Sequence, residues 1–542
     1  MEFFHSNSFS SQVRHLMGQH HIPGLAIAII QDDEVASAGY GYASLNPEKP
    51  CTADTLFDIA SCSKSMTAAS VALLVEDNER HPEVQWEVTM SSLLPEDFVM
   101  PDLEDTKRVT IDDVLSHMTG MADNETALLG NRSAHQDTPR SITRNLRNLP
   151  MAHPLRAKWE YCNIMYSAAA HLVAEKSGQT FNDFLETCIF RPLNMSSTSL
   201  QPTSAEAKGF GDRLAKGHDW KWDSEKGGYI EFPQLAETEG EGAGCVVTSA
   251  NDFIKWVKAF LNREGPISEK VYRGLTRLRA VTEPAAGVKG ARRFESPEMY
   301  AAGLEASWYR GYAIVGHYGN VPGFGSRFFF VPEMGFGAAF MGNGRRANRV
   351  ITALSRVLIN AVLDLPPVPR PVRKVGNAKR DVVVRAKNQT VGQAESASDE
   401  TKEVGGEPKN EKSKDQTTAR NPKAPKSKKP QQEKKPRPQT KPLGDYVGKY
   451  WHPGYHRLTV SIKDDKLFID AMDRSYYGMT LTFDHVANHT KYTAHLNYVN
   501  ETFDEEIRAE FVFGESGRAV KMGLKLEQAL NHLIWFELEN DT

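Results

Sequence analysis

The strongest constraint on the fold is a change in composition in the second half of the 542-residue chain. Residues 366–442 contain 20 Lys and Arg against 9 Asp and Glu, and prolines recur among them without apolar periodicity. A segment with dense charge and few apolar residues cannot bury enough surface to fold. We therefore predict a disordered linker at 366–442 between two folded domains, 1–365 and 443–542. The basic cluster 423–435 could bind nucleic acid or another acidic partner, or serve as a nuclear signal. It lacks the interleaved aromatic residues of a single-strand nucleic-acid site, which favours a solvated linker over nucleic-acid binding.

The C-terminal part has the pattern of an all-β domain. Apolar and polar residues alternate in seven short stretches, and turn formers such as Asp464-Asp465 separate them. The stretches are 458–462, 467–471, 479–483, 492–496, 507–513, 521–526 and 534–538. This regular spacing predicts a small up-and-down β-barrel.

The N-terminal part mixes helix and strand patterns. It begins with an amphipathic helix at 5–20 and two antiparallel strands at 22–30 and 34–42. Helical patterns dominate from about 65 to 250. Strand patterns then return at 312–315, 325–331 and 335–341, and a helix at 346–363 follows. Strands at both ends of the segment therefore enclose a section rich in helices.

The sequence carries no pattern of a secreted or membrane protein. The apolar stretch 22–30 contains Pro23 and is too short to span a bilayer. The five cysteines are odd in number and lack metal-ligand spacing, which favours free thiols in a reducing compartment. We expect a cytoplasmic protein with no metal and no cofactor.

A candidate nucleophile stands at the start of a predicted helix. Ser61 and Lys64 are three residues apart, so their side chains share one helix face, with Cβ atoms about 5–6 Å apart. A serine hydroxyl becomes a good nucleophile when a base takes its proton, and a lysine can be that base if burial lowers its pKa. The pattern alone also fits a solvated helix start, because Ser-x-x-Lys recurs by chance in long chains.

Two further patterns follow along the chain, Tyr161-Cys162-Asn163 and His317-Tyr318-Gly319. Together with Ser61-Cys62-Ser63-Lys64, they resemble the motifs of the serine β-lactamase and penicillin-binding protein superfamily. The resemblance is narrowest to the peptidase S12-type branch of D-aminopeptidases, DD-carboxypeptidases and class C lactamase-related esterases. It covers about residues 10–365 and implies the family's α/β (α+β) fold, an antiparallel sheet flanked by helices plus a helical subdomain. The C-terminal barrel resembles the lipocalin-like domain appended to some D-aminopeptidase-type members.

The resemblance implies catalytic roles for four side chains. Ser61 would be the nucleophile that forms an acyl ester, and Lys64 its base. Tyr161 would share the proton relay, with a pKa lowered by two cations. His317 takes the place of lysine in the lactamase Lys-Thr-Gly motif, where it would tune Tyr161 and the leaving group. Without the other motifs, the pattern His317-Tyr318-Gly319 is also typical of an ordinary histidine in a turn.

The resemblance also implies a binding site for the substrate. Asn163 would hold the acyl side chain, and the backbone N–H groups of Ser61 and Asn320, which follows Gly319, would form the oxyanion hole. The chain departs from the family pattern at Tyr318, where Thr or Ser is usual, and this puts penicillin recognition in doubt. His117 is interpreted as a residue that fixes a loop through a hydrogen bond, and the cysteines within the motifs as small buried residues.

These patterns predict a serine hydrolase that acts through an acyl-enzyme on an amide or ester, with a small molecule or short peptide as its partner. One alternative is an acyltransferase that uses the same intermediate, with an acceptor other than water. A second alternative is a catalytically inactive scaffold whose barrel and linker recruit partners. No membrane partner is expected, and the sequence leaves the oligomeric state open.

Overall fold

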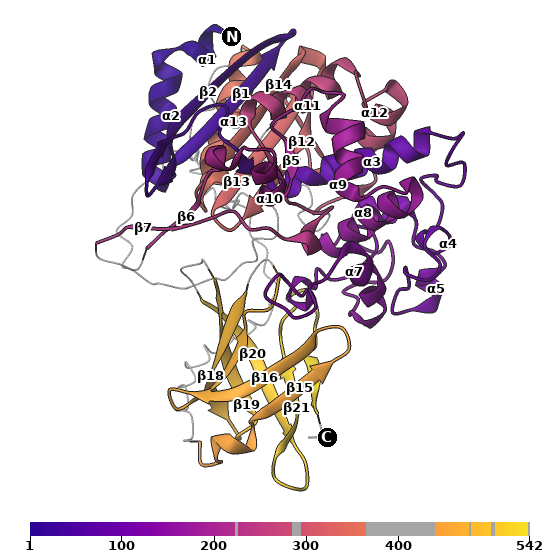
Figure 1. Cartoon of the computed structure of the whole chain (residues 1–542), viewed down its shortest axis with the longest axis vertical. Coiled ribbons are helices and arrows are strands. Elements are labelled where there is room, and N and C mark those ends of the chain that lie inside the picture. The colour runs from indigo at the N-terminus through magenta and orange to yellow at the C-terminus, as the bar shows by residue number, and fades with distance from the viewer. Residues whose placement is uncertain (223–225, 284–293, 365–438, 476–477, 500–503, 540–542) are drawn as a thin grey trace, which may run out of the picture.

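The computed structural model describes residues 1–222, 226–283, 294–364, 439–475, 478–499 and 504–539 (Figure 1). They form a larger N-terminal part, built on a nine-stranded sheet, and a smaller C-terminal barrel. The predicted linker at 366–442 lies outside the described residues except for its last four. None of the described helices combines the length and the apolar character that crossing a bilayer requires.

The nine-stranded sheet is antiparallel between all neighbours and has the order β3-β2-β1-β14-β13-β12-β11-β10-β9. Its strands are β1 (Gly24–Gln31), β2 (Glu34–Leu45), β3 (Glu48–Pro50), β9 (Ala280–Val281), β10 (Met299–Tyr300), β11 (Glu305–Tyr309), β12 (Tyr312–Val321), β13 (Phe324–Val331) and β14 (Phe336–Gly342). The sheet thus joins strands from both ends of the N-terminal part, as the sequence predicted.

The larger helices are α2 (Asn7–His20), α3 (Lys64–Glu76), α8 (Asn163–Ser177), α11 (Ala250–Asn262), α12 (Glu269–Thr276) and α13 (Ala347–Val362). The shorter ones are α1 (Glu2–His5), α4 (Met90–Leu93), α5 (Leu103–Thr106), α6 (Ile111–Leu115), α7 (Pro139–Asn145), α9 (Phe181–Leu185) and α10 (Pro202–Ala207). Two small sheets complete this part. One has the order β4 (Phe57–Asp58), β8 (Val246–Thr248), β5 (Ser199–Leu200), and the other pairs β6 (Gly217–Trp220) with β7 (Tyr229–Phe232).

Helices cover both faces of the large sheet (Figure 1). On one face, α2 and α13 bury their apolar side chains against the strands, and Ile27 of β1 belongs to this core. On the other face, α11 and α3 enclose a second core that contains Ala28 and Ile30 of the same strand. Successive side chains of a strand point to opposite faces. A strand covered on both faces is therefore apolar at nearly every position, and β1 is.

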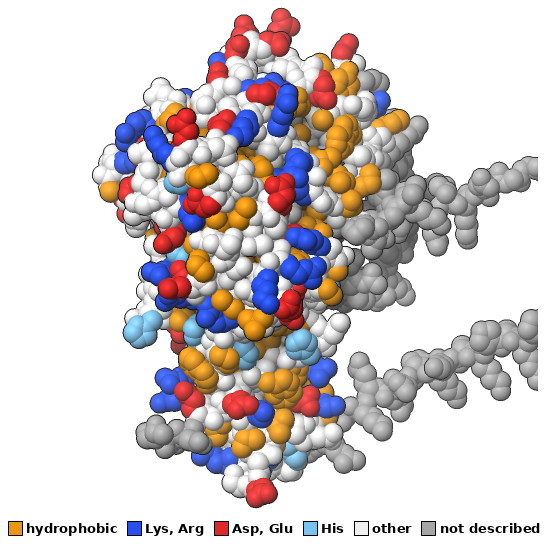
Figure 2. All heavy atoms as spheres, turned by 90° about the vertical axis from the view of Figure 1, so that its right-hand side faces the viewer, with side chains coloured by type: hydrophobic (Ala, Val, Ile, Leu, Met, Phe, Trp, Pro, Cys, Tyr) orange, Lys and Arg blue, Asp and Glu red, His pale blue; other side chains and the backbone are white. Residues whose placement is uncertain are grey.

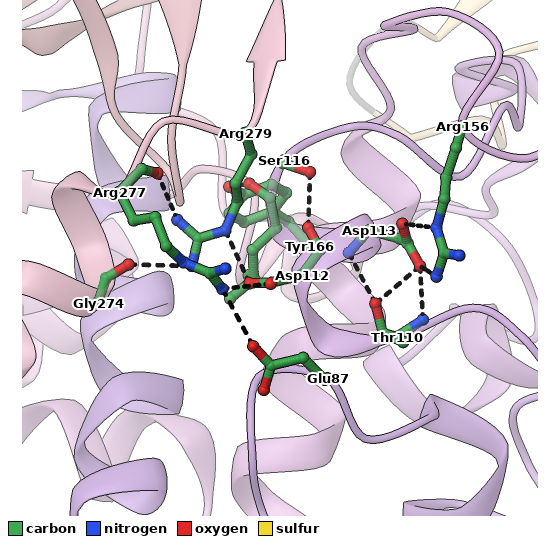
Figure 3. Close-up of polar contacts among 11 residues, drawn as sticks. Glu87, Thr110, Asp112, Asp113, Ser116, Arg156, Tyr166, Gly274, Arg277 and Arg279 are labelled. Carbon is green, nitrogen blue, oxygen red and sulfur yellow. Dashed lines mark hydrogen bonds and ion pairs between the residues drawn. The ribbon is translucent and has the colours of Figure 1, made fainter.

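The short helix α6, which packs against α8, is anchored by ion pairs and hydrogen bonds (Figure 3). Thr110 and Asp113 form a capping box at its start, and Arg156 binds both carboxylate oxygens of Asp113 at 2.7 Å. Arg277 and Arg279 bind the carboxylate of the adjacent Asp112. These contacts fix the loop that follows α6 and leads toward the candidate site.

The C-terminal part is a closed eight-stranded barrel in which each strand pairs with the next and the last returns to the first. Its strands are β15 (Gly448–His452), β16 (His456–Lys463), β17 (Lys466–Ala471), β18 (Met479–Ala487), β19 (Lys491–Tyr498), β20 (Asp504–Phe513), β21 (Ala519–Leu524) and β22 (Ile534–Leu538). The predicted up-and-down barrel is confirmed. Sequence reasoning found seven of the strands and missed β15.

The barrel and the larger part are joined by direct contacts. The loop between β17 and β18 forms a β-bridge with the larger part, Leu129 to Arg474. On the face shown in Figure 2, the two parts form one continuous surface with positive and negative side chains interspersed. The barrel therefore contributes to the surroundings of the loop that contains Leu129.

Candidate active site

Ser61 lies in a tight turn that connects β4 to α3. The turn is a 3-10 helix, Ala60–Ser63, and the α-helix proper begins at Lys64. Ala60 has a φ of 48°, a left-handed conformation that costs a residue with a Cβ atom about 1 kcal/mol or more. The Asp58 carboxylate accepts the backbone N–H of Ala60 at 2.6 Å and holds the turn in place. The chain thus presents Ser61 on a strained, hydrogen-bonded corner.

Gly319 allows strand β12 to pack directly against this turn. A Cβ atom at Gly319 would lie 2.2 Å from both Ile59 O and Ser326 Oγ. These atoms are themselves joined by a 2.7 Å hydrogen bond, so they cannot move apart cheaply. Only glycine fits here. The close approach brings Asn320, the next residue of β12, beside the turn that carries Ser61.

The hydroxyl of Ser61 is contacted by both of its predicted partners. Lys64 Nζ lies 3.1 Å from Ser61 Oγ, and Tyr161 OH lies 2.9 Å from the same oxygen. Lys64 is fully buried and also donates to Ala243 O at 2.7 Å. Its amine faces the rings of Tyr161 and Tyr166, at 4.8 and 5.4 Å from their centroids. The structure thus brings Lys64 and Tyr161 together around the hydroxyl oxygen of Ser61.

Burial makes Lys64 the better base of the two partners. Desolvation lowers the pKa of Lys64 to about 7, although the carboxyl groups of Glu125 and Asp123 act in the opposite direction. Burial raises the pKa of Tyr161 well above its usual range. The expectation that two cations lower the pKa of Tyr161 is therefore wrong. At neutral pH the phenol keeps its proton, and a large fraction of Lys64 is a neutral amine.

We predict that acylation of Ser61 accelerates as pH rises through about 7. Below the pKa of about 7 Lys64 carries its proton and cannot accept another; above it the free amine is the predominant form. The measurement is the second-order rate constant for labelling by a fluorophosphonate probe between pH 5 and 9. A rate that is constant or falls across this range would exclude Lys64 as the base.

Asn163 begins helix α8 and is held by two carboxylates. Its backbone N–H donates to Asp123 Oδ1 at 3.0 Å, and its side-chain amide donates to Glu125 Oε1 at 2.6 Å. Sequence reasoning missed both acids, because no pattern links residues about forty positions apart. With Nδ2 bound by Glu125, the amide group is fixed with its oxygen as the free acceptor.

The barrel reaches the turn that carries these two acids. Tyr455 OH donates to Asn124 Oδ1 at 2.5 Å, and both side chains are buried. Glu527, between β21 and β22, is buried nearby and accepts the backbone N–H of Asn124; burial raises its pKa to about 8. The sequence carried no signal for either barrel residue. The barrel therefore supports the turn that positions Asn163.

His317 lies within strand β12, so it is not a turn histidine. Its Nδ1 is 2.5 Å from Tyr318 O and therefore carries the proton, which leaves Nε2 to accept the hydroxyl of Tyr300 at 2.9 Å. Burial lowers the pKa of His317 to about 3, so the ring is neutral. Tyr300, which sequence reasoning missed, is the partner in place of Tyr161. Cys62, whose thiol donates to His317 O at 3.2 Å, fills the space between the turn and β12.

His117 lies beside Tyr161 and is bonded to the loop that precedes Asn163. His117 Nδ1 accepts the backbone N–H of Cys162 at 3.1 Å, and its ring lies 4.2 Å from that of Tyr161, centroid to centroid. It fixes the loop before Asn163, as predicted.

Among the described residues no group of three or more His, Cys, Asp or Glu is arranged to hold a metal ion.

Comparisons with known proteins match each part of the chain to a described family. Residues 9–361 match the family described as Beta-lactamase, and residues 432–537 match a domain of unknown function (DUF3471). The chain is 32% identical over 542 residues to an unguisins hydrolase of Aspergillus campestris, with 98% of this chain and 92% of that one covered. It is 24% identical to a D-aminopeptidase of Brucella anthropi over 60% of this chain and 56% of that one. The structure of an octameric penicillin-binding protein homologue from Pyrococcus abyssi shares the fold, with a TM-score of 0.54, 16% identity and coverage of 98% and 99%.

Proposed function

Because the chain belongs to the beta-lactamase family, we propose that it is a serine hydrolase that cleaves peptide-type amide bonds through an acyl-enzyme. One observation carries the proposal: Ser61 Oγ is within hydrogen-bond reach of a buried lysine whose pKa is about 7 and of a protonated tyrosine. The groups form a nucleophile, a base and an acid around one oxygen atom.

In the first step, Ser61 Oγ attacks the carbonyl carbon and Lys64 takes the hydroxyl proton. The neutral amine must act as acceptor at this moment, which its lowered pKa permits at neutral pH. We assign the oxyanion hole to the backbone N–H groups of Ser61 and Asn320, and one donor of this kind is typically worth about 100- to 1000-fold in rate. Gly319 supports the assignment, since it brings the strand and the turn into contact.

In the second step, the leaving nitrogen needs a proton. Tyr161 OH is protonated and contacts the oxygen that has just formed the new bond, so we assign it as the donor. The proton on Lys64 then restores the phenol. Deacylation repeats the sequence with water in place of Ser61, and Lys64 again acts as the base.

We assign Asn163 to the binding of the acyl part of the substrate. Its side-chain oxygen is left as a hydrogen-bond acceptor by the contact with Glu125, which suits an N–H group of a peptide. The full-length likeness to an unguisins hydrolase, which includes the barrel, supports a hydrolase role for both parts of the chain acting together.

The test is a substrate screen with purified full-length protein. It compares D- and L-amino-acid amides, short peptides, a short-chain ester and a chromogenic cephalosporin, with products read by mass spectrometry. We expect hydrolysis of amides with release of the free acid. Turnover of the ester alone, or transfer of the acyl group to an added amine with no free acid, would contradict the proposal.

His317→Ala is expected to lower kcat by about 10- to 1000-fold while the acyl-enzyme remains detectable. His317 contacts Tyr300 and does not reach Ser61 through any hydrogen bond of the described residues, so it acts as a positioning residue. The measurement is kcat with burst-phase analysis from pH 5 to 9. Tyr300→Phe removes only the hydroxyl and should reproduce part of the loss. If the kcat of His317→Ala equals that of the wild type from pH 5 to 9, His317 is not a positioning residue.

A further inference from the structure

A cavity of about 100 Å³ lies where the barrel meets the larger part. Loop residues of the larger part form one wall: Gly130, Asn131, Arg132, Leu235, Glu237 and Glu239. The barrel forms the other with Met472, Arg474, Ser475, Gly478 and Val499. About 15 Å³ of such space is enough to hold one water, so the cavity has room for a group of several atoms.

Both segments of the larger part that line the cavity continue into the candidate active site. The segment that contains Glu237 and Glu239 runs on to Ala243, whose carbonyl accepts the Lys64 amine. The loop that contains Gly130 begins at the turn whose Glu125 holds Asn163. These two segments thus connect the cavity to the candidate active site along the chain.

The guanidinium group of Arg474 has donors that contacts with the described residues leave unpaired. The residue is only 4% exposed, and Nη2 donates to Arg457 O at 2.8 Å. Nε and Nη1 have no hydrogen-bond partner among the described residues, and Asp473 lies 3.9 Å away as a distant ion pair. A buried donor without a partner loses its hydrogen bonds to water and gains none in return. Two such donors on one side chain at a cavity wall indicate a ligand that accepts from them.

Glu237 and Glu239, on the wall formed by the larger part, limit the chemistry of a ligand that could bind there. The Glu237 carboxyl group makes no hydrogen bond to any described residue, whereas Glu239 is already bound by Ser475 at 2.5 Å and Gln136 at 2.9 Å. Burial, with Glu239, Asp58 and Glu125 nearby, raises the pKa of Glu237 well above its usual range. A neutral amide offers an oxygen to the guanidinium and an N–H to the carboxyl group, so it satisfies both walls.

We propose that this cavity is a remote subsite for a peptide amide of the substrate, in which Arg474 donates to the carbonyl oxygen and Glu237 accepts from the N–H. The inference rests on the proposed hydrolase function and narrows its substrate class to peptides longer than one residue. It also gives the barrel a direct part in substrate selection.

The experiment compares short and extended substrates that share one reacting residue. The probes are phenylalanine 4-nitroanilide, the same compound extended by three glycines on its amino side, and phenylalanyl-triglycine amide, each in the D and L forms. We expect Arg474→Met to lower the ratio of kcat/KM for an extended substrate to that for the short one by about 10- to 100-fold, mainly through KM. Arg508→Met, an exposed barrel arginine, is the matched control and should leave the ratio unchanged.

Glu237→Ala tests the same cavity from the other wall and does not depend on the folding of the barrel loop. It should lower the same ratio in the same direction. An unchanged ratio in both variants, or an equal loss on short and extended substrates, would show that the two side chains are structural and would overturn the subsite. Labelling of Ser61 by a fluorophosphonate in these variants separates this failure from a failure of the hydrolase function.

Discussion

Ser61→Ala is expected to lower turnover of every amide substrate by about 10⁴- to 10⁶-fold without changing the fold. Both side chains that contact Ser61 Oγ depend on the oxygen that this substitution removes: Lys64 at 3.1 Å takes its proton, and Tyr161 at 2.9 Å donates to the leaving nitrogen once that oxygen has formed the new bond. The measurement is steady-state turnover on the best amide of the screen, together with the circular dichroism spectrum and the unfolding midpoint.

The control for Ser61→Ala lies in the same turn. Ser63 accepts the backbone N–H of Val246 at 3.2 Å and has no hydrogen bond to Lys64 or Tyr161. Ser63→Ala should therefore cost some stability and retain most activity. Should Ser61→Ala keep even a tenth of the wild-type rate while Lys64→Ala does not, the nucleophile is assigned to the wrong residue.

Lys64→Arg should be nearly as inactive as Ser61→Ala, with a loss of about 10³-fold or more, because a guanidinium keeps its proton and cannot act as the base. The native amine has a pKa of about 7 because it is buried, and an arginine in the same place would stay charged. Both turnover and the rate of fluorophosphonate labelling should fall. Thermal unfolding checks that the variant folds, since a larger charged group enters a fully buried site.

A second substitution at Lys64 separates the effect of losing the base from the effect of burying a larger charged group. Lys64→Met removes the base and keeps a side chain of similar length without a charge to bury. It should fold at least as stably as Lys64→Arg and be equally inactive. Rapid labelling of Ser61 in either variant would mean that another group takes the proton.

Local spacing predicted the Ser61–Lys64 pair and the order of helices and strands, whereas the fold class and the roles of Tyr161, Asn163 and His317 were implied by the resemblance to a family. The three-residue offset places Lys64 beside Ser61 in either a 3-10 or an α-helical turn. Alternating apolar residues predicted seven of the eight barrel strands. The missed strand, β15, pairs with β16 but is short and offers little alternation.

The features that were not predicted arise from contacts between distant segments. The burial that lowers the pKa of Lys64 and raises that of Tyr161 is a property of the assembled core. The hydrogen bond between Tyr300 and His317 was not predicted for a related reason, since it joins strand β10 to strand β12. No local pattern marks Asn124 as the residue that the barrel holds.

The most direct test of the account is the mass of the intact protein after reaction with a fluorophosphonate probe, followed by peptide mapping. We expect a single adduct located on Ser61, formed faster at pH 8 than at pH 6 and absent from Ser61→Ala. A folded wild-type protein that gains no adduct, or one that carries the adduct on another residue, would contradict it.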